Sequence, residues 1–212
     1  MAQRAAEFIR DAIRSGALSP GQAVPEAATA ASLRVSRNTV REAFRLLGGE
    51  GLLVHHVHRG VVVRQLDEAD VRDIYAVRRT LELAAVGAAR CLPPRGMDRL
   101  RGAVLEAEQA AGRGDWRAVS TLNLEFHQRL VALAGSPRLD EFFARILTEL
   151  RLAFAAVADQ PEFLLPYVRE NRTLCDAIAA GRWDDALAGL RAYLARSERT
   201  VLEAVGAAEH RE

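Results

Sequence analysis

Long apolar runs are missing from this sequence of 212 residues. A transmembrane helix needs about 18 or more consecutive apolar residues, and no segment approaches that length. Residues 1–20 also lack the order of basic, apolar and small residues that defines a secretory signal peptide. These absences predict a cytoplasmic protein that has no membrane partner.

Cysteine and lysine are scarce as well. The two cysteines, Cys91 and Cys175, lie far apart and have no second thiol nearby, which excludes a disulfide framework and a cysteine-ligated zinc site. We expect both to be buried thiols. Lysine is absent, so all 29 basic residues are arginines. Such a bias more often records a GC-rich genome than a selected property, and we assign it no function.

An excess of charge of either sign is also absent, because 29 basic residues face 28 acidic ones. Their distribution is nevertheless uneven. Residues 1–66 hold nine arginines and five acidic residues, a net charge of +4, whereas the remainder has a net charge of −3. A basic small segment joined to an acidic large one is typical of a nucleic-acid-binding domain followed by a domain of another kind. We therefore place one domain at 1–66 and a second at 67–212.

Residues 1–66 predict three short helices and a β-hairpin. The first helix should end at Ser15-Gly16, and the second should span Pro25 to Leu33 with the proline in its first turn. Ser36 is positioned to cap a third helix, which Gly48-Gly49 ends. The apolar stripe of the first helix consists of Phe8, Ile9, Ala12 and Ile13, and that of the third consists of Val40, Ala43, Phe44 and Leu47. The two β-favouring runs after them are residues 52–54 and 61–63. This order of elements is typical of a winged helix-turn-helix domain.

From residue 67 to 212 the pattern is helical almost throughout. Six helices near 20 residues long, with short connections, favour antiparallel packing. Apolar residues at helical spacing should face inward, such as Leu122, Phe126, Leu130 and Leu133. The interruptions between helices are Pro93-Pro94, residues 112–114, residues 135–137, Gln160-Pro161 and Gly181. The predicted fold class is mainly α, with an antiparallel all-α bundle joined to the winged helix-turn-helix at Gln65 to Glu68.

The third predicted helix carries arginines four residues apart, which places them together on the face opposite its apolar stripe. Guanidinium groups pair bidentately with guanine or bind phosphates, and polar residues at the helix start can reach a base edge or a phosphate. The alternative is a solvated arginine face compensated by Glu42. The place of this helix as the second of a helix-turn-helix favours DNA recognition. The candidate contacts are Arg37, Asn38, Thr39, Arg41 and Arg45.

The tip of the predicted hairpin provides a second group of candidate DNA contacts, His58, Arg59 and Gly60. Glycine permits close approach to the DNA backbone, and arginine is favoured in a minor groove. Strand alternation would place His56 and His58 on one face, which leaves a metal site as an alternative. No carboxylate and no second cluster of ligands supports that alternative, so contact with DNA is the favoured interpretation.

Several segments of the first domain form one set of motifs: Ile13-Arg14-Ser15-Gly16, Pro20-Gly21, Val35-Ser36-Arg37-Asn38-Thr39-Val40-Arg41-Glu42-Ala43, Glu50-Gly51-Leu52 and Arg59-Gly60-Val61-Val62-Val63. This set resembles the GntR family of bacterial transcription regulators. In that family the two arginines of the Ser-Arg-x-x-Val-Arg-Glu segment contact the operator, which implies this role for Arg37 and Arg41. The wing glycine of the family corresponds to Gly60. Some members use a basic residue on the second helix, where this chain has Ala27.

The second domain resembles the FCD domain, the all-helical effector domain of the FadR subfamily, beginning at Asp70 to Glu82 and continuing to the C-terminus. Members commonly hold a metal ion with one aspartate and three histidines. In register with those ligands this chain has Asn123, His127, Asn171 and Tyr193. Amides and a phenol near its usual pKa are poor metal ligands. The resemblance therefore implies no tight metal site and no cofactor.

These four polar positions lie on faces that should point into the bundle. Buried polar groups need partners, so the four side chains either bond to one another in a dry core or line a pocket for an organic ligand. The family resemblance favours the pocket. Arg78 and Arg151 lie on helices that border it in the family, where an inward arginine would suit an anionic effector, although both would also suit the surface.

Together these observations predict a homodimeric DNA-binding repressor that a small-molecule effector controls, and no enzyme. Two-fold symmetry matches a palindromic operator on double-stranded DNA. One alternative is a regulator that has lost its ligand or metal response and uses the helical domain only to dimerise. An enzyme that uses His127 is more distant, because no nucleophile or carboxylate pair has a catalytic spacing.

Overall fold

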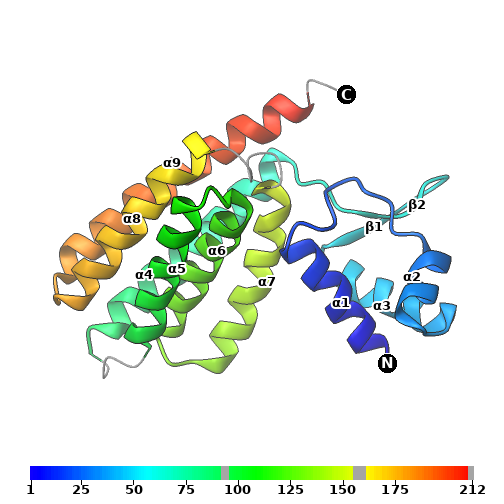
Figure 1. The fold of residues 1–212 in the computed structure, drawn as a ribbon, viewed down its shortest axis with the longest axis horizontal. Coiled ribbons are helices and arrows are strands. Elements are labelled where there is room, and N and C mark those ends of the chain that lie inside the picture. Colours follow the sequence, from blue (N-terminus) through cyan, green and yellow to red (C-terminus); the bar gives the residue numbers. More distant parts are fainter. Residues whose placement is uncertain (92–95, 155–160, 210–212) are drawn as a thin grey trace. The chain divides into compact units, whose positions relative to one another are not determined.

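A computed structural model describes residues 1–91, 96–154 and 161–209. Within these ranges the chain forms nine helices and one two-stranded antiparallel sheet (Figure 1), which confirms the predicted mainly α fold class. The chain divides into two compact units. The first contains residues 1–66 together with the end of the seventh helix from Thr148, and the second contains the rest of the described chain.

Three helices of the first unit pack around a small core. They are α1 (Ala2–Arg14), α2 (Glu26–Leu33) and α3 (Arg37–Gly49). Ala5, Ile9 and Ile13 are buried on α1, which packs against the buried face of α3. Phe8 is 54% exposed. Its predicted place in the buried stripe is therefore wrong, because residues four apart, starting at Ala5, form the face of α1 that α3 covers.

Capping residues mark the limits of α2 and the start of α3. Pro25 lies at the N-cap of α2, one position before the predicted first turn, and Arg34 ends α2 in the left-handed conformation with φ at 53°. Ser36 then caps α3, because its hydroxyl oxygen accepts a hydrogen bond from the Thr39 backbone N–H at 3.1 Å. The predicted start of the third helix is thereby confirmed.

The wing consists of β1 (Leu53–His56) and β2 (Gly60–Val63), with Leu53 opposite Val63. The edge of β2 that faces away from β1 pairs with the chain before α2, where the Val24 N–H donates to the Val61 carbonyl at 2.9 Å. The expectation that His56 and His58 share one strand face is wrong, because His58 lies in the turn between the strands with φ at 78°. Gly60 has φ at 72°, a conformation that glycine adopts without strain.

The second unit is helical, and five of its helices pack closely on one another. Helix α4 packs against α6 and α9, and α8 packs against α5, α6 and α9. Asp67 and Asp70 form a capping box at the start of α4, which satisfies two backbone N–H groups that the helix itself cannot bond. The six helices are α4 (Glu68–Ala89), α5 (Met97–Gly112), α6 (Trp116–Ala132), α7 (Pro137–Phe154), α8 (Pro161–Ala179) and α9 (Trp183–Glu209). They match the predicted number, while the interruption at Pro93-Pro94 and the residue Gln160 lie outside the described residues.

The predicted inward stripe of α6 is buried at Phe126, Leu130 and Leu133 and partly buried at Leu122. The two cysteines differ. Cys175 is buried as expected, but Cys91 is exposed just after α4, so the expectation is wrong for Cys91. No helix within the described ranges combines the length and the apolarity that crossing a membrane requires.

Replacing Arg34 by glycine should stabilise the first unit. A left-handed conformation costs an L-residue roughly 1–2 kcal/mol and costs glycine almost nothing. We expect Arg34→Gly to raise the free energy of unfolding in urea by about 1 kcal/mol. Arg34→Ala is the matched control, because it removes the same charge but keeps the strained Cβ atom. Equal unfolding midpoints for the glycine and alanine variants would show that the left-handed conformation of Arg34 costs no stability.

Candidate functional site

Helix α3 presents its arginines on the side turned away from the core. Arg37, Arg41 and Arg45 are exposed, whereas the apolar residues between them are buried. Asn38 is also exposed, and Thr39 is partly buried. The Thr39 hydroxyl shares a hydrogen bond of 2.9 Å with the Ser36 hydroxyl. The structure therefore exposes four of the five predicted contacts of this helix and leaves Thr39 partly exposed.

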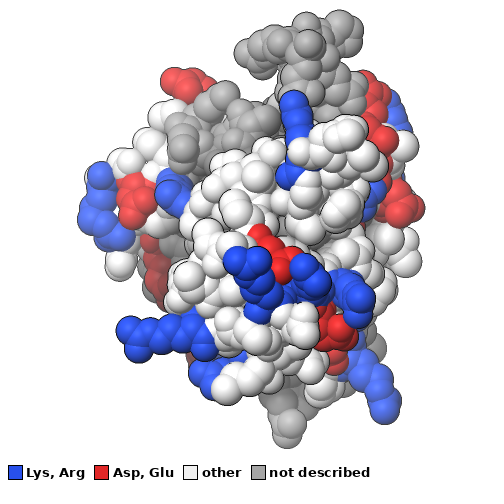
Figure 2. Space-filling view, turned by 90° about the vertical axis from the view of Figure 1, so that its right-hand side faces the viewer, with Lys and Arg blue, Asp and Glu red and all other residues white. Residues whose placement is uncertain are grey.

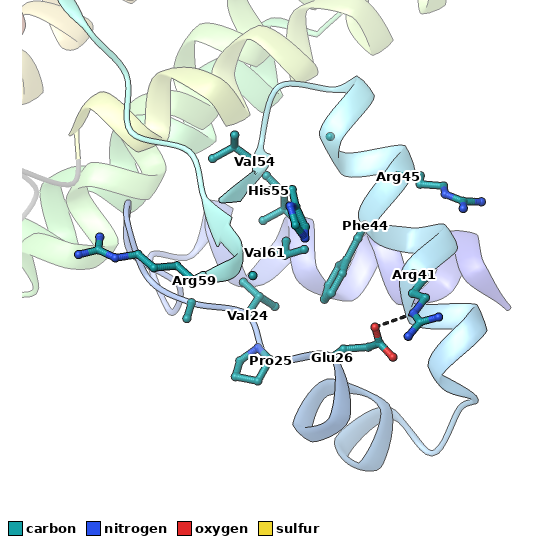
Figure 3. A pocket seen from close by; sticks show the side chains of 14 residues that line it. Val24, Pro25, Glu26, Arg41, Phe44, Arg45, Val54, His55, Arg59 and Val61 are labelled. Atoms are coloured by element: carbon teal, nitrogen blue, oxygen red, sulfur yellow. Dashed lines mark hydrogen bonds and ion pairs between the residues drawn. The ribbon is translucent and has the colours of Figure 1, made fainter. Parts of the chain in front are cut away.

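Arg41 is held by a carboxylate from the neighbouring helix. Its Nε donates a hydrogen bond to Glu26 Oε2 at 2.7 Å, and Glu26 lies in the first turn of α2 (Figure 3). This hydrogen bond raises the pKa of Arg41 above its usual value. Glu26 was not predicted from the sequence, because the pair is 15 residues apart and no local spacing rule connects the two residues.

The other two arginines of α3 are restrained less. Arg45 pairs with Glu42 at 3.3 Å, but the two side chains are 80% and 53% exposed, and ion pairs of this kind contribute little. Compensation by Glu42 therefore applies only to Arg45. No hydrogen bond or ion pair within the described part of the chain occupies the guanidinium group of Arg37, which leaves it available to a ligand.

A groove of about 650 Å³ lies between α3 and the wing. Figure 3 shows Arg41 and Arg45 on the helix side of it and Arg59 on the wing side. Gly60 of the predicted wing tip also lines this groove, whereas His58 is exposed in the turn and is not part of the lining. Phe44 and His55 line the groove without having been singled out as candidates.

Charges of both signs are interspersed on the face of the molecule in Figure 2, where arginines alternate with carboxylates and uncharged surface separates them. This distribution differs from a continuous basic patch. Binding to DNA through this surface would depend on the placement of individual guanidinium groups more than on the total charge.

The interior of the second unit contains a buried cluster of three ionisable side chains, Arg78, Glu82 and His127. The Arg78 Nε donates to Glu82 Oε1 at 2.7 Å, and His127 Nδ1 lies 2.7 Å from Glu82 Oε2. The three side chains are each at most 1% exposed. The guanidinium of Arg78 also lies over the ring of Tyr75, 5.0 Å from its centroid.

The protonation states in this cluster follow from burial and from the two neighbours of Glu82. Burial opposes ionisation of Glu82, but the charge of Arg78 and the hydrogen bonds from Arg78 and His127 outweigh it and hold the pKa of Glu82 below its usual value. Burial lowers the pKa of His127 in spite of the nearby carboxylate. The histidine is therefore neutral near pH 7, with Nδ1–H donating to the Glu82 carboxylate, and the Arg78–Glu82 pair carries no net charge.

A second group of buried polar side chains lies beside this cluster. Asn123 Oδ1 accepts hydrogen bonds from Asn171 Nδ2 at 2.7 Å and from the Tyr193 hydroxyl at 3.0 Å. The rings of His127 and Tyr193 are 4.9 Å apart between centroids. The structure thus brings together the four positions that the FCD resemblance singled out.

The two predicted arginines of this region differ in place. Arg78 belongs to the buried cluster, whereas Arg151 is buried near the end of α7, in a segment that groups with the first compact unit. Glu82 was missed as a site residue. The four-residue spacing between Arg78 and Glu82 could have indicated it, because residues at that spacing meet on one helix face.

The residues in register with the family's metal ligands do not fit a metal ion. The side-chain oxygen of Asn123 already accepts two hydrogen bonds. Burial raises the pKa of Tyr193 well above its usual value, so this phenol keeps its proton. No group of three or more His, Cys, Asp and Glu side chains within the described residues could hold a metal ion.

Three buried polar atoms of this region lack a hydrogen-bond partner in the part of the chain that the structure describes: Arg78 Nη2, His127 Nε2 and Asn171 Oδ1. With Nδ1 of His127 protonated, they comprise one donor group and two acceptors. An unpaired buried polar atom is costly. The region therefore retains hydrogen-bonding capacity for water or for a small polar molecule.

A recognition helix with outward arginines, a wing and a separate helical unit define a class, the winged helix-turn-helix regulators with a helical regulatory domain. The model of the bacterial regulatory proteins of the gntR family matches residues 1–63, and the FCD domain model matches residues 73–196. The chain belongs to the GntR family and carries an FCD domain.

Similar proteins support the same assignment. The chain is 31% identical over 181 residues to a "Probable D-xylose utilization operon transcriptional repressor" of Paenarthrobacter nicotinovorans, covering 85% of this chain and 80% of the relative. It is 30% identical to the Nta operon transcriptional regulator of Aminobacter aminovorans, covering 88% and 87%. The crystal structure of a GntR transcriptional regulator from Rhodococcus sp. RHA1 is 36% identical, with a TM-score of 0.88 over 95% of this chain and 97% of that one. These relatives are DNA-binding transcriptional regulators and not enzymes.

Removing the carboxylate of Glu82 should strongly destabilise the second unit. Glu82→Gln leaves the buried Arg78 guanidinium without its counter-charge, which we expect to lower the free energy of unfolding by about 3–5 kcal/mol. The double variant Arg78→Met, Glu82→Leu removes both charges and should recover most of that loss. Urea denaturation measures both effects, and a double variant no more stable than Glu82→Gln would show that the ion pair is not the cause.

Proposed function

We propose that this protein is a homodimeric transcriptional repressor that reads a palindromic operator with α3 and the wing and is released by a small polar effector. The observation that carries DNA reading is the outward arginine face of α3 beside a groove that continues to the wing. The relative from Paenarthrobacter nicotinovorans, whose name describes a repressor, supports the direction of regulation.

The first unit fits a duplex in a specific way. With the N-terminal part of α3 in the major groove, Arg37 and Arg41 would face base edges, and Asn38 and Thr39 would face bases or phosphates. Arg59 on the far side of the groove would then meet the DNA backbone or the minor groove. In a two-fold symmetric dimer, the half-sites would lie about one helical turn apart.

The buried cluster of the second unit supports an effector site. Arg78 Nη2 can donate to a ligand oxygen, while His127 Nε2 and Asn171 Oδ1 can accept from ligand hydroxyl groups. Because Glu82 neutralises Arg78, an anion would meet no uncompensated charge there. We therefore propose an effector different from the anion expected from the sequence. It is an uncharged molecule that carries several hydroxyl groups and binds without a metal ion or cofactor.

A second candidate is a regulator whose helical unit serves only for dimerisation. It is favoured by the bonds within the cluster, because Asn123, Asn171 and Tyr193 already bond to one another. The two candidates share the same DNA-binding surface and differ only in whether a ligand changes operator affinity.

Substituting Arg37 tests the DNA-binding part of the proposal. An operator is first selected from random DNA with the full-length protein, and affinities are then measured for every single-base variant. If Arg37 contacts a base, Arg37→Ala should lose about 10- to 100-fold of discrimination at one base pair of each half-site. If it contacts a phosphate, all sequences should weaken alike.

Arg191→Ala is the matched control, because it removes an exposed arginine from α9 in the second unit. It should leave operator affinity unchanged. A wild-type protein that binds selected and random DNA equally at every salt concentration would overturn the proposed function.

A thermal-shift screen tests the effector. Uncharged polyhydroxylated compounds and matched carboxylates are compared, with operator release as a second readout. A ligand that binds the folded protein raises its melting temperature by mass action, and it releases DNA only if it prefers the form that does not bind DNA. We expect a hydroxylated compound to do both and Tyr193→Phe to weaken its effect. A response to carboxylates alone would contradict the assigned ligand chemistry, and no response in either class would favour the second candidate.

A further inference from the structure

We infer that Glu26 is a specificity-determining positioning residue, whose carboxylate orients the guanidinium group of Arg41 so that its two Nη atoms can pair with a guanine of the operator. This inference rests on the proposed function, because it concerns the same DNA-binding surface. It assigns a role in base reading to a residue of α2 that need not touch the DNA itself.

The bonding pattern of Arg41 supports this role. The hydrogen bond to Glu26 Oε2 uses Nε, at 2.7 Å. Among the described residues, no hydrogen bond occupies Nη1 or Nη2 of Arg41. Bidentate recognition of guanine O6 and N7 needs two N–H groups of one guanidinium, and the terminal pair of Arg41 remains available for it.

The contact with Glu26 restricts a side chain that would otherwise be mobile. Arg41 is 62% exposed, whereas the Glu26 side chain is only 27% exposed. Figure 3 shows the Glu26 carboxylate reaching from the start of α2 to the guanidinium of Arg41. A side chain that is ordered before binding loses less conformational entropy when it binds, so the pair prepares Arg41 for recognition.

The arginines on either side of Arg41 provide the contrast. Arg45 bonds to Glu42 of its own helix in a pair exposed on both sides, and Arg37 has no partner within the described residues. Of the three arginines of α3, Arg41 is thus the one whose described contacts include a carboxylate from a different helix. The geometry therefore points to Arg41 as the arginine of α3 that is ordered before it meets a base.

The same ion pair has an opposite interpretation, in which Glu26 competes with DNA for Arg41. The two interpretations predict different results. If Glu26 competes, removing its charge should tighten binding to every sequence. If Glu26 positions Arg41, removing its charge should reduce discrimination at one base pair, because an unrestrained arginine makes the bidentate contact less often.

The test compares Glu26→Gln with Glu42→Gln in the full-length protein. Both variants remove one carboxylate that pairs with an arginine of α3, so their effects on general electrostatic attraction should be similar. We expect Glu26→Gln to lose about tenfold of discrimination at one guanine of each half-site, and Glu42→Gln to lose none. Affinities for single-base operator variants and for random DNA provide the measurement.

Two further variants keep the result interpretable. In an Arg41→Ala background, Glu26→Gln should cause no additional loss of discrimination, since it acts through Arg41. Glu26→Asp keeps the charge but shortens the reach, so it should lose discrimination without gaining affinity for random DNA.

Equal behaviour of Glu26→Gln and Glu42→Gln would overturn the inference, as would a uniform gain in affinity. Neither result would affect the operator preference of the wild-type protein or the effect of Arg37→Ala. A wild-type protein without operator preference would instead overturn the proposed function itself, so the two failures are distinguishable.

Discussion

The proposed recognition of DNA depends on the burial of one face of α3. Val40, Ala43 and Leu47 are fully buried, and the helix that carries them packs on α1. This packing sets the rotation of α3 about its own axis. Every arginine of the opposite face consequently points to solvent, and a change that rotated the helix would move all of them together.

A bidentate ion pair secures the far end of the same interface. Arg10 of α1 donates to both carboxylate oxygens of Glu50, at 2.9 and 2.7 Å. Paired N–H···O bonds of this kind define direction as well as distance. Hydrophobic packing and this ion pair thus hold α3 against α1. Among the arginines of α3 that face solvent, Arg41 is the one that bonds to another helix.

The second unit keeps polar groups in its interior by compensating their charge. Arg78 and Glu82 neutralise each other, and His127 stays neutral because burial lowers its pKa. A molecule that enters this region must replace or extend hydrogen bonds that the cluster already makes. Competition of this kind favours ligands that carry both donors and acceptors, which is the basis of the proposed effector chemistry.

Local rules were sufficient to predict the cap at Ser36, the end of α1 at Ser15-Gly16 and the shared face of the three arginines. The predicted end of α3 at Gly48-Gly49 is early, because both glycines lie within the helix and Glu50 is its C-cap. The sequence did not determine the turn conformation of His58 or the exposure of Phe8, because these depend on what packs nearby. Tertiary packing alone establishes the contacts of Glu26 with Arg41 and of Glu82 with His127, in pairs 15 and 45 residues apart. Spacing rules reach about four residues along a helix, and beyond that distance the packing of one helix on another selects the partners.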